Sequence, residues 1–226
     1  MPLTLRCKEE CRNAGVSMIT RRFYSTLPFV LLAASFALGA AGNRAVAGSS
    51  VRLMNLAGQP VDPFADVKAK IFVFLFVRAD CPISNRYAPE VGRLVQEFAS
   101  STVSFTLVYV DPSESSDRIR EHMREYGYHV QAARDNDHVL VKMIGAKVTP
   151  EAAVFVRGPI GASRNSVGTE RMVYRGRIDD QYVDFGKTRP APTTHDLEDV
   201  LQAIVQGRTV IPQTTRAVGC FIQDLK

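Results

Sequence analysis

The feature that most restricts the fold of this chain is an uncharged run, Ile71–Val77, which is followed after three residues by a cysteine and then by a helical pattern. Continuous β-branched and aromatic residues of this kind are typical of a central strand buried on both faces. Cys81 and Pro82 come next, and apolar residues then recur at helical spacing from Val91 to Phe98. Cys81 is therefore predicted to lie where a central strand leads into a helix.

A cysteine at such a junction is well placed to react. Unpaired backbone N–H groups and the positive end of the helix dipole both favour a thiolate at a helix N-terminus. The neighbours of Cys81 include Arg78, Asp80 and Ser84, so we expect a partly exposed polar setting rather than a core one. The alternative is that Cys81 is a small buried hydrophobic residue, as a single cysteine most often is.

The first part of the chain has the pattern of a secretory signal peptide, which we assign to residues 1–47. An arginine pair precedes the uncharged stretch Phe23–Asn43, and Ala45-Val46-Ala47 supplies small residues for cleavage. An uncleaved membrane anchor is the alternative, although a proline and an Ala/Gly-rich end make the stretch a poor span. Either way we expect the folded part to be exported, to the periplasm or outside the cell, where conditions are oxidising.

Net charge gives no reason to expect a nucleic-acid partner. The formal charge is +5, but residues 1–47 carry six basic and two acidic residues, which leaves the rest of the chain near +1. The four histidines are scattered without metal-ligand spacing. We therefore expect neither a metal nor another cofactor.

Apolar periodicity after the signal predicts strands that alternate with helices. Residues 48–207 are assigned to one domain, and residues 208–226 to a C-terminal tail that carries Cys220. Strands that alternate with helices and end in an antiparallel hairpin predict an α/β fold whose mixed sheet is covered by helices. Besides Ile71–Val77, the predicted strands are Val51–Leu56, Val103–Val110, a short edge strand His129–Ala133, Ala152–Val156 and Arg171–Ile178. The predicted later helices begin near Ser113, at an N-cap of Asn136 or Asp137, and at an N-cap of Thr194.

Four segments, taken in order, resemble the thioredoxin-like superfamily and its exported redoxin-domain members. The segment CPISNRYAP, from Cys81 to Pro89, is similar to a thioredoxin active site, and GAKVTPEAAVF is similar to the segment that carries the family's cis-proline. VYRGRIDD and AVGCFI are similar to endings of exported bacterial redoxin-domain proteins of the peroxiredoxin/thioredoxin type. The resemblance, which covers residues 51 to 206, implies a three-layer α/β/α fold with a mixed central sheet. It also implies a nucleophilic thiolate at Cys81 and a substrate groove formed by Pro150 and the Thr149 backbone.

The sequence departs from each of the three known patterns. Ser84 stands where thioredoxins have their second cysteine, and Leu75 stands where they have a buried carboxylate. Arg78 replaces the Thr or Ser of peroxiredoxins, and Val77 occupies the position of an additional cysteine in Sco-type copper chaperones. Because Ser84 cannot form a local disulfide, another group must resolve the oxidised form of Cys81.

Cys220 is the candidate for that role, because Cys81 and Cys220 are the only cysteines after residue 47. Two thiols in one exported domain often pair, and Gly219 lets the backbone approach closely. We hypothesise that the tail folds back and that Cys220 forms a disulfide with Cys81 in the oxidised protein. A fixed structural disulfide is the alternative.

Two more residues have two possible roles each. Ser84 donates a hydrogen bond to the Cys81 thiolate or only caps the helix. Arg78 lowers the pKa of Cys81 and holds a substrate oxygen, or it is only a solvated surface residue.

The function implied is that of an exported thiol oxidoreductase. Its expected partners are a protein disulfide or a small peroxide as substrate and a thiol reductant, with a membrane contact only if the N-terminal segment is uncleaved. A Sco-like copper-binding module and a redox-inert binding domain are the alternatives.

Overall fold

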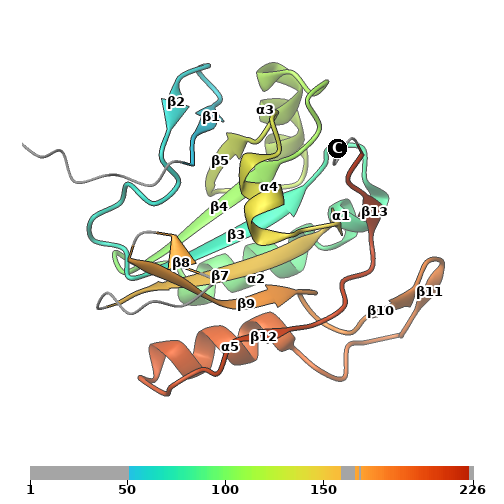
Figure 1. Ribbon diagram of the computed structural model, residues 1–226. Helices are drawn as coiled ribbons and strands as arrows, with labels where there is room; N and C mark the ends of the chain where they lie inside the picture. The colour runs from blue at the N-terminus through green and yellow to red at the C-terminus, as the bar shows by residue number, and fades with distance from the viewer. Residues whose placement is uncertain (1–50, 159–165, 168, 224–226) are drawn as a thin grey trace, which may run out of the picture. The chain divides into compact units, whose positions relative to one another are not determined.

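The strand that the sequence places at the centre of the fold does lie there. In the computed structural model every residue of β3 (Ile71–Val77) is buried. On one side β3 pairs in parallel with β4 (Val103–Tyr109), and on the other it pairs antiparallel with β7 (Glu151–Arg157). The structure describes residues 51–158, 166–167 and 169–223, all of which belong to one compact unit (Figure 1).

Nine strands of the described residues form one mixed sheet. Its order is β12-β9-β7-β3-β4-β5-β1-β2, and β8 pairs with β9. Two shorter pairs lie outside it, β10 with β11 and β6 with β13. The bounds not yet given are β1 (Leu53–Asn55), β2 (Pro60–Val61), β5 (Gln131–Arg134), β6 (Val148–Thr149), β8 (Ser166–Val167), β9 (Glu170–Gly176), β10 (Tyr182–Asp184), β11 (Lys187–Thr188), β12 (Gln213–Thr214) and β13 (Cys220–Phe221).

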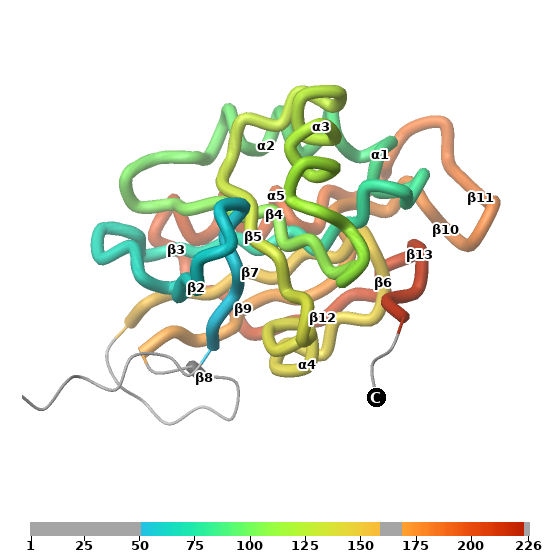
Figure 2. Tube along the Cα trace, turned by 90° about the horizontal axis from the view of Figure 1, so that it is seen from above, coloured from blue at the N-terminus to red at the C-terminus, as the bar shows by residue number. Residues whose placement is uncertain are grey.

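Helices cover both faces of this sheet, which confirms the predicted three-layer α/β/α fold. The first core cluster joins one face to α1, α2, α3 and α5. The second joins the other face to α4, and Figure 2 shows α4 on the opposite side of the strands from α1, α2 and α3. The helices are α1 (Pro82–Arg86), α2 (Ala88–Phe98), α3 (Ser116–Glu125), α4 (Val139–Ile144) and α5 (Asp196–Val205).

The two faces of β3 belong to different cores. Val73 and Leu75 pack in the first cluster, whereas Phe72 and Phe74 pack in the second. The ring of Phe64 meets the rings of Phe72 and Phe74 edge-on, with centroids 5.2 and 5.3 Å apart. Each buried phenylalanine stabilises the fold by about 1.5–3 kcal/mol, so β3 is a rigid support for the residues that follow it.

Some local predictions were wrong. The strand expected at residues 129–133 is β5, and it is not at the edge, because β1 pairs with it at Met54↔Arg134. Neither Asn136 nor Asp137 caps α4, since the carboxylate of Asp135 accepts hydrogen bonds from the N–H groups of Val139 and Val141, at 2.7 and 2.8 Å.

The start of α5 also differs from the prediction. His195, not Thr194, is its N-cap residue, and the Thr194 hydroxyl donates to the carboxylate of Asp196 instead.

The C-terminal tail contributes two short strands that the sequence pattern did not reveal. β12 adds a parallel strand beside β9, and β13 pairs antiparallel with β6. The proposed signal, residues 1–47, lies outside the described residues. Among the helices that the structure describes, none is long and apolar enough to cross a membrane.

Candidate functional site

Cys81 lies between the central strand and a helix, as the sequence predicts. It is the N-cap residue of α1, and Pro82 occupies the first helical turn. The backbone N–H of Ser84 donates a hydrogen bond to Cys81 Sγ at 3.4 Å. The thiol itself donates to the carbonyl oxygen of Thr149 at 3.1 Å. The sulfur thus joins the start of α1 to the end of β6.

The expectation that Cys81 is partly exposed was wrong, because only 1% of the residue is accessible. Strand β13 of the tail lies against β6, with Cys220 directly opposite Thr149. A Cβ on Gly219 would stand 2.1 Å from the Thr149 carbonyl oxygen, so this approach requires glycine. The tail covers a sulfur that the local sequence alone would leave open.

The peptide bond between Thr149 and Pro150 is cis, as in the family segment that this part of the sequence resembles. Both residues are buried. The geometry therefore brings together four predicted site residues, Cys81, Ser84, Thr149 and Pro150, with Cys220 across from them.

The two cysteines are free thiols with opposite pKa shifts. Burial raises the pKa of Cys81, but the side chains of Cys220, Ser84 and Thr149 favour the thiolate and leave the pKa below its ordinary value. For Cys220, burial and the neighbouring Cys81 sulfur raise the pKa to about 12. Cys81 is therefore the more readily ionised thiol, and Cys220 retains its proton beside it.

Two buried hydroxyl groups next to Cys81 have no partner of their own. Ser84 Oγ and Thr149 Oγ1 form no hydrogen bond with any residue that the structure describes. An unpaired buried hydroxyl is costly, and a thiolate at Cys81 would give both groups an acceptor. The two hydroxyls fit an anionic sulfur better than a neutral one.

A comparison with protein-family models finds the AhpC/TSA family over residues 45–166, more than half of the chain. The chain belongs to the AhpC/TSA family. It is a redoxin-domain protein with a thioredoxin-like fold. Membership supports thiol-based oxidoreductase chemistry at the level of the family.

Solved structures are similar to this AhpC/TSA-family protein in fold. An uncharacterised conserved protein from Geobacillus kaustophilus has 24% sequence identity and a TM-score of 0.62, over 78% of this chain and 90% of that one. A hypothetical protein from Sinorhizobium meliloti has 20% identity and a TM-score of 0.58, over 78% and 91%. A thioredoxin-like protein from Aeropyrum pernix has 14% identity and a TM-score of 0.47, over 71% and 89%. A search of the curated proteins found no match.

One of the two roles expected for Arg78 in this AhpC/TSA-family protein was that of a solvated surface residue. The structure does not support that role. The Arg78 side chain is 14% exposed and forms ion pairs with Asp80 at 2.9 Å and Asp111 at 3.0 Å. Two carboxylates thus neutralise the guanidinium. The pair with Asp111 joins the loop that follows β3 to the loop that follows β4.

The backbone of Ala79, two residues before the nucleophile candidate, is held at its N–H and at its carbonyl by two polar side chains. A carboxylate oxygen of Glu114 accepts from the Ala79 N–H at 2.6 Å. The side-chain amide of Asn85 donates to the Ala79 carbonyl oxygen at 3.1 Å. Burial raises the pKa of Glu114 to about 7, and nearby Asp111 and Asp80 contribute to the increase.

A buried histidine holds the Asn85 side chain in position. His122 Nε2 lies 2.8 Å from Asn85 Oδ1, and His122 Nδ1 lies 2.8 Å from the Tyr109 hydroxyl. Burial lowers the pKa of His122 to about 4, so the ring is neutral at physiological pH. Since Asn85 Oδ1 only accepts, Nε2 carries the proton and Nδ1 accepts from Tyr109.

The sequence analysis missed Asn85, Glu114 and His122, although part of the signal was present. Strands β3 and β4 are parallel, so their carboxyl ends meet at the same edge of the sheet. Polar residues soon after each strand, such as Asp80 and Glu114, are therefore expected to lie together. No comparable signal indicates His122, which is one histidine on a polar helix.

Two groups of described residues could hold a metal ion by their spacing. Their members are Glu90, His195 and Glu198 in one group and Asp80, Asp111 and Glu114 in the other. Neither group contains a cysteine. In the second group the guanidinium of Arg78 already pairs with the carboxylates of Asp80 and Asp111.

Proposed function

We propose that this protein is a thiol oxidoreductase in which Cys81 is the nucleophile and Cys220 is its resolving partner. One observation carries the proposal: Thr149 accepts the Cys81 hydrogen bond and is also the residue opposite Cys220 in the β6–β13 pair. Both thiols therefore meet at the same peptide unit. Their opposite pKa shifts support this division of roles, since Cys81 is the more readily ionised thiol.

The substrate that best suits this arrangement is a protein disulfide. The Cys81 thiolate attacks one sulfur of the substrate, a mixed disulfide forms, and the other substrate sulfur leaves as a thiolate that takes up a proton. Cys220 then loses its proton and attacks Cys81 Sγ, which releases the second substrate thiol and leaves a Cys81–Cys220 disulfide. Two electrons pass from the protein to the substrate, and an external thiol reductant restores both cysteines.

Peroxide reduction is the second candidate, and membership in the AhpC/TSA family favours it. In that reaction the Cys81 thiolate takes one peroxide oxygen to form a sulfenic acid, and an alcohol or water leaves. Cys220 then condenses with the sulfenic acid and releases water. Arg78, however, stands at the position of the expected Thr or Ser, and two carboxylates already bind its guanidinium.

We also propose that residues 1–47 are a cleaved signal, that residues 48–207 form the redoxin domain, and that residues 208–226 are the tail that brings Cys220 to the site. Export to the periplasm or beyond would suit a pair of thiols that cycles through a disulfide. Amino-terminal sequencing of the protein from the secreting cell tests the cleavage. An intact N-terminus would favour the membrane anchor.

Activity measurements on two cysteine variants test the proposed function. We expect the wild-type protein to reduce insulin disulfides with dithiothreitol as the reductant, and Cys81→Ser to lose this activity. Cys220→Ser, reduced beforehand and then freed of dithiothreitol, should react once and stop as a mixed disulfide. Full activity in Cys81→Ser would contradict the proposal. Hydrogen peroxide consumed faster than insulin disulfides would favour the second candidate, and stoichiometric copper binding would favour the Sco-like alternative.

A further inference from the structure

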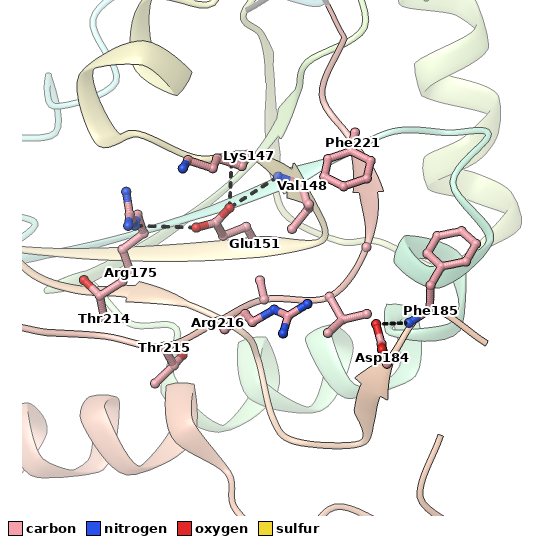
Figure 3. Close-up of a pocket in the computed structure, with 13 residues that line it drawn as sticks. Lys147, Val148, Glu151, Arg175, Asp184, Phe185, Thr214, Thr215, Arg216 and Phe221 are labelled. Atoms are coloured by element: carbon pink, nitrogen blue, oxygen red, sulfur yellow. Dashed lines mark hydrogen bonds and ion pairs between the residues drawn. The ribbon is translucent and has the colours of Figure 1, made fainter. Parts of the chain in front are cut away.

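A cavity of about 640 Å³ lies beside the tail strand, on residues that the proposed reaction does not use. Its walls come from the beginning of β7, from β9, from the tail between β12 and β13, and from the β10–β11 hairpin (Figure 3). The volume is typical of ligand-binding pockets. Gly219 and Phe221, the two neighbours of Cys220, form part of the wall, so an occupant would lie close to the redox pair.

One side of the cavity carries more positive than negative charge, because Lys147, Arg175 and Arg216 face the single carboxylate of Glu151 there. Lys147 and Arg216 are exposed, and neither forms an ion pair with a described residue. Arg175 lies 3.6 Å from Glu151 and donates to backbone carbonyl groups. The Glu151 carboxylate is used internally, because it accepts from the Lys147 N–H at 2.8 Å. Asp184 is the opposing charge, at the hairpin wall (Figure 3).

The wall formed by the tail offers free backbone groups. The N–H of Thr215 donates to Arg175 at 3.0 Å, and ladder pairing resumes at Cys220. Between them the backbone of residues 216–218 forms no hydrogen bond with any other residue that the structure describes. Backbone groups of this kind suit an extended polypeptide, which binds by main-chain hydrogen bonds.

Two aromatic rings at the cavity are unusually accessible. Phe185 is 68% exposed and Phe221 is 75% exposed. Figure 3 shows both rings on the side of the cavity away from Arg175 and Lys147. An occupant that covers the rings and meets Lys147 therefore needs an apolar end and an acidic end, with Arg216 between the two (Figure 3).

We propose that this cavity binds an extended segment of a substrate protein, with acidic residues at Lys147 and Arg216 and an apolar side chain at Phe185 and Phe221. The inference rests on the proposed function, because it names the substrates whose disulfides the Cys81–Cys220 pair reduces. A segment that follows residues 216–218 is led along the tail towards Cys220. The selected substrates are protein disulfides next to acidic and apolar sequence.

The test compares two short peptides, each with one internal disulfide, that differ only in charge. The first carries Asp, Glu and Phe beside the disulfide, and the second carries Lys and Arg in place of the acidic residues. We expect pre-reduced wild-type protein to reduce the acidic peptide about tenfold faster in a single turnover, since two charge contacts of ordinary strength give that factor. Lys147→Glu/Arg216→Glu should reverse the preference. The control Lys68→Glu/Arg208→Glu, which changes the net charge equally outside the cavity, should keep it.

Binding of the same peptides with serine in place of cysteine is measured by fluorescence anisotropy, so the result does not depend on redox activity. Preferred binding of the acidic peptide, reversed only by the cavity variant, supports the inference. Equal binding and equal rates for the two peptides would overturn the inference and leave the proposed function intact. If neither peptide is reduced but the acidic one binds, the proposed function fails instead. The protein could instead reduce glutathione disulfide as fast as the acidic peptide and lose that rate equally in the cavity variant. This result would overturn the assignment to a protein segment.

Discussion

The charge on Cys81 depends on a small number of neighbouring groups. Its burial opposes ionisation, and the surrounding polar side chains more than offset that effect. Ser84 contributes a backbone N–H and a buried hydroxyl without another partner. Because a hydrogen bond to a charged group is stronger than one to a neutral group, the Ser84 hydroxyl should matter most when Cys81 is a thiolate.

Replacing Ser84 tests this interpretation. Ser84→Ala should raise the pKa of Cys81 by about one unit, since one such hydrogen bond contributes about 1.5 kcal/mol. The ultraviolet absorbance of the thiolate, followed against pH in the Cys220→Ser background, measures the shift. Ser101→Ala, an exposed serine outside the site, is the control and should change nothing. An unchanged pKa in Ser84→Ala would show that the hydroxyl does not stabilise the thiolate.

Glu114 gives a second prediction at this scale, about stability. Its pKa is about 7 in the folded protein against an ordinary 4.5, so folding favours the protonated form. The resulting stability is fully present below about pH 4.5 and is lost as the pH rises through 7. Wild type should therefore lose up to ~3 kcal/mol of unfolding free energy over that range relative to Glu114→Gln. Urea denaturation at both ends of the range measures it, and parallel pH profiles would refute the assignment.

Among the elements, the tail strand β13 controls access to the reactive sulfur. Ile222 is 5% exposed and packs in the second core cluster, and its N–H donates to the Lys147 carbonyl oxygen at 3.0 Å. Phe221, in contrast, is mostly exposed. The strand therefore depends on Ile222 as its apolar anchor. Because Cys81 is only 1% exposed beneath this strand, β13 limits access to the sulfur.

Loosening the anchor should expose Cys81. Truncation of a buried isoleucine to alanine costs about 2–5 kcal/mol, and in Ile222→Ala that loss falls on the tail. We expect Cys81 to react with a bulky maleimide at least several times faster than in wild type, in a Cys220→Ser background. The matched control is Ile211→Ala, because Ile211 is 81% exposed. Equal rates in all proteins would mean that the tail does not cover the thiol.

Gly219 offers an independent test of the same strand. A Cβ at Gly219 would meet the Thr149 carbonyl carbon and oxygen, so Gly219→Ala should push β13 away and slow formation of the Cys81–Cys220 disulfide. Gly92→Ala, in α2 with no atom near the added Cβ, should instead stabilise the protein by about 0.5–1 kcal/mol. Timed quenching with an alkylating reagent measures the pairing. A Gly219→Ala protein that forms the disulfide as fast as wild type would contradict the close approach.

The elements were predictable to the extent that they follow apolar periodicity. The run Ile71–Val77 reads as a buried central strand, and the helix pattern after Cys81 is equally direct. β12 and β13 were not predictable, because two residues are too few to show a period. Cap residues were missed where a side chain from an adjacent loop, such as Asp135, satisfies the helix terminus.

At the scale of the whole molecule, two residues far apart in sequence meet at one site. Cys81 follows the central strand, and Cys220 stands near the end of the chain. The sequence indicates both cysteines and the flexible Gly219, but it cannot give the register that sets Cys220 opposite Thr149. Long-range pairing also explains why Cys81 is buried, although its sequence neighbours are polar.

A disulfide across this long loop should stabilise the molecule. Cross-linking Cys81 to Cys220 restricts the unfolded chain, which corresponds to about 4–5 kcal/mol for a loop of this length. The oxidised protein should therefore unfold at a higher urea concentration than the reduced protein. Cys220→Ser should show no difference between the two conditions. If the oxidised wild type were less stable than the reduced form, the two sulfurs would not meet without strain.

The most direct test of the central claim is mass spectrometry of the unreduced protein, equilibrated over a series of glutathione redox ratios and quenched with an alkylating reagent. We expect two states only: a reduced form with both cysteines alkylated, and an oxidised form that yields a peptide linking Cys81 to Cys220. Under reducing conditions the oxidised form should return completely to free thiols. Two free thiols under every oxidising condition, or a linked peptide that no reductant opens, would contradict the claim that Cys81 and Cys220 form a redox pair.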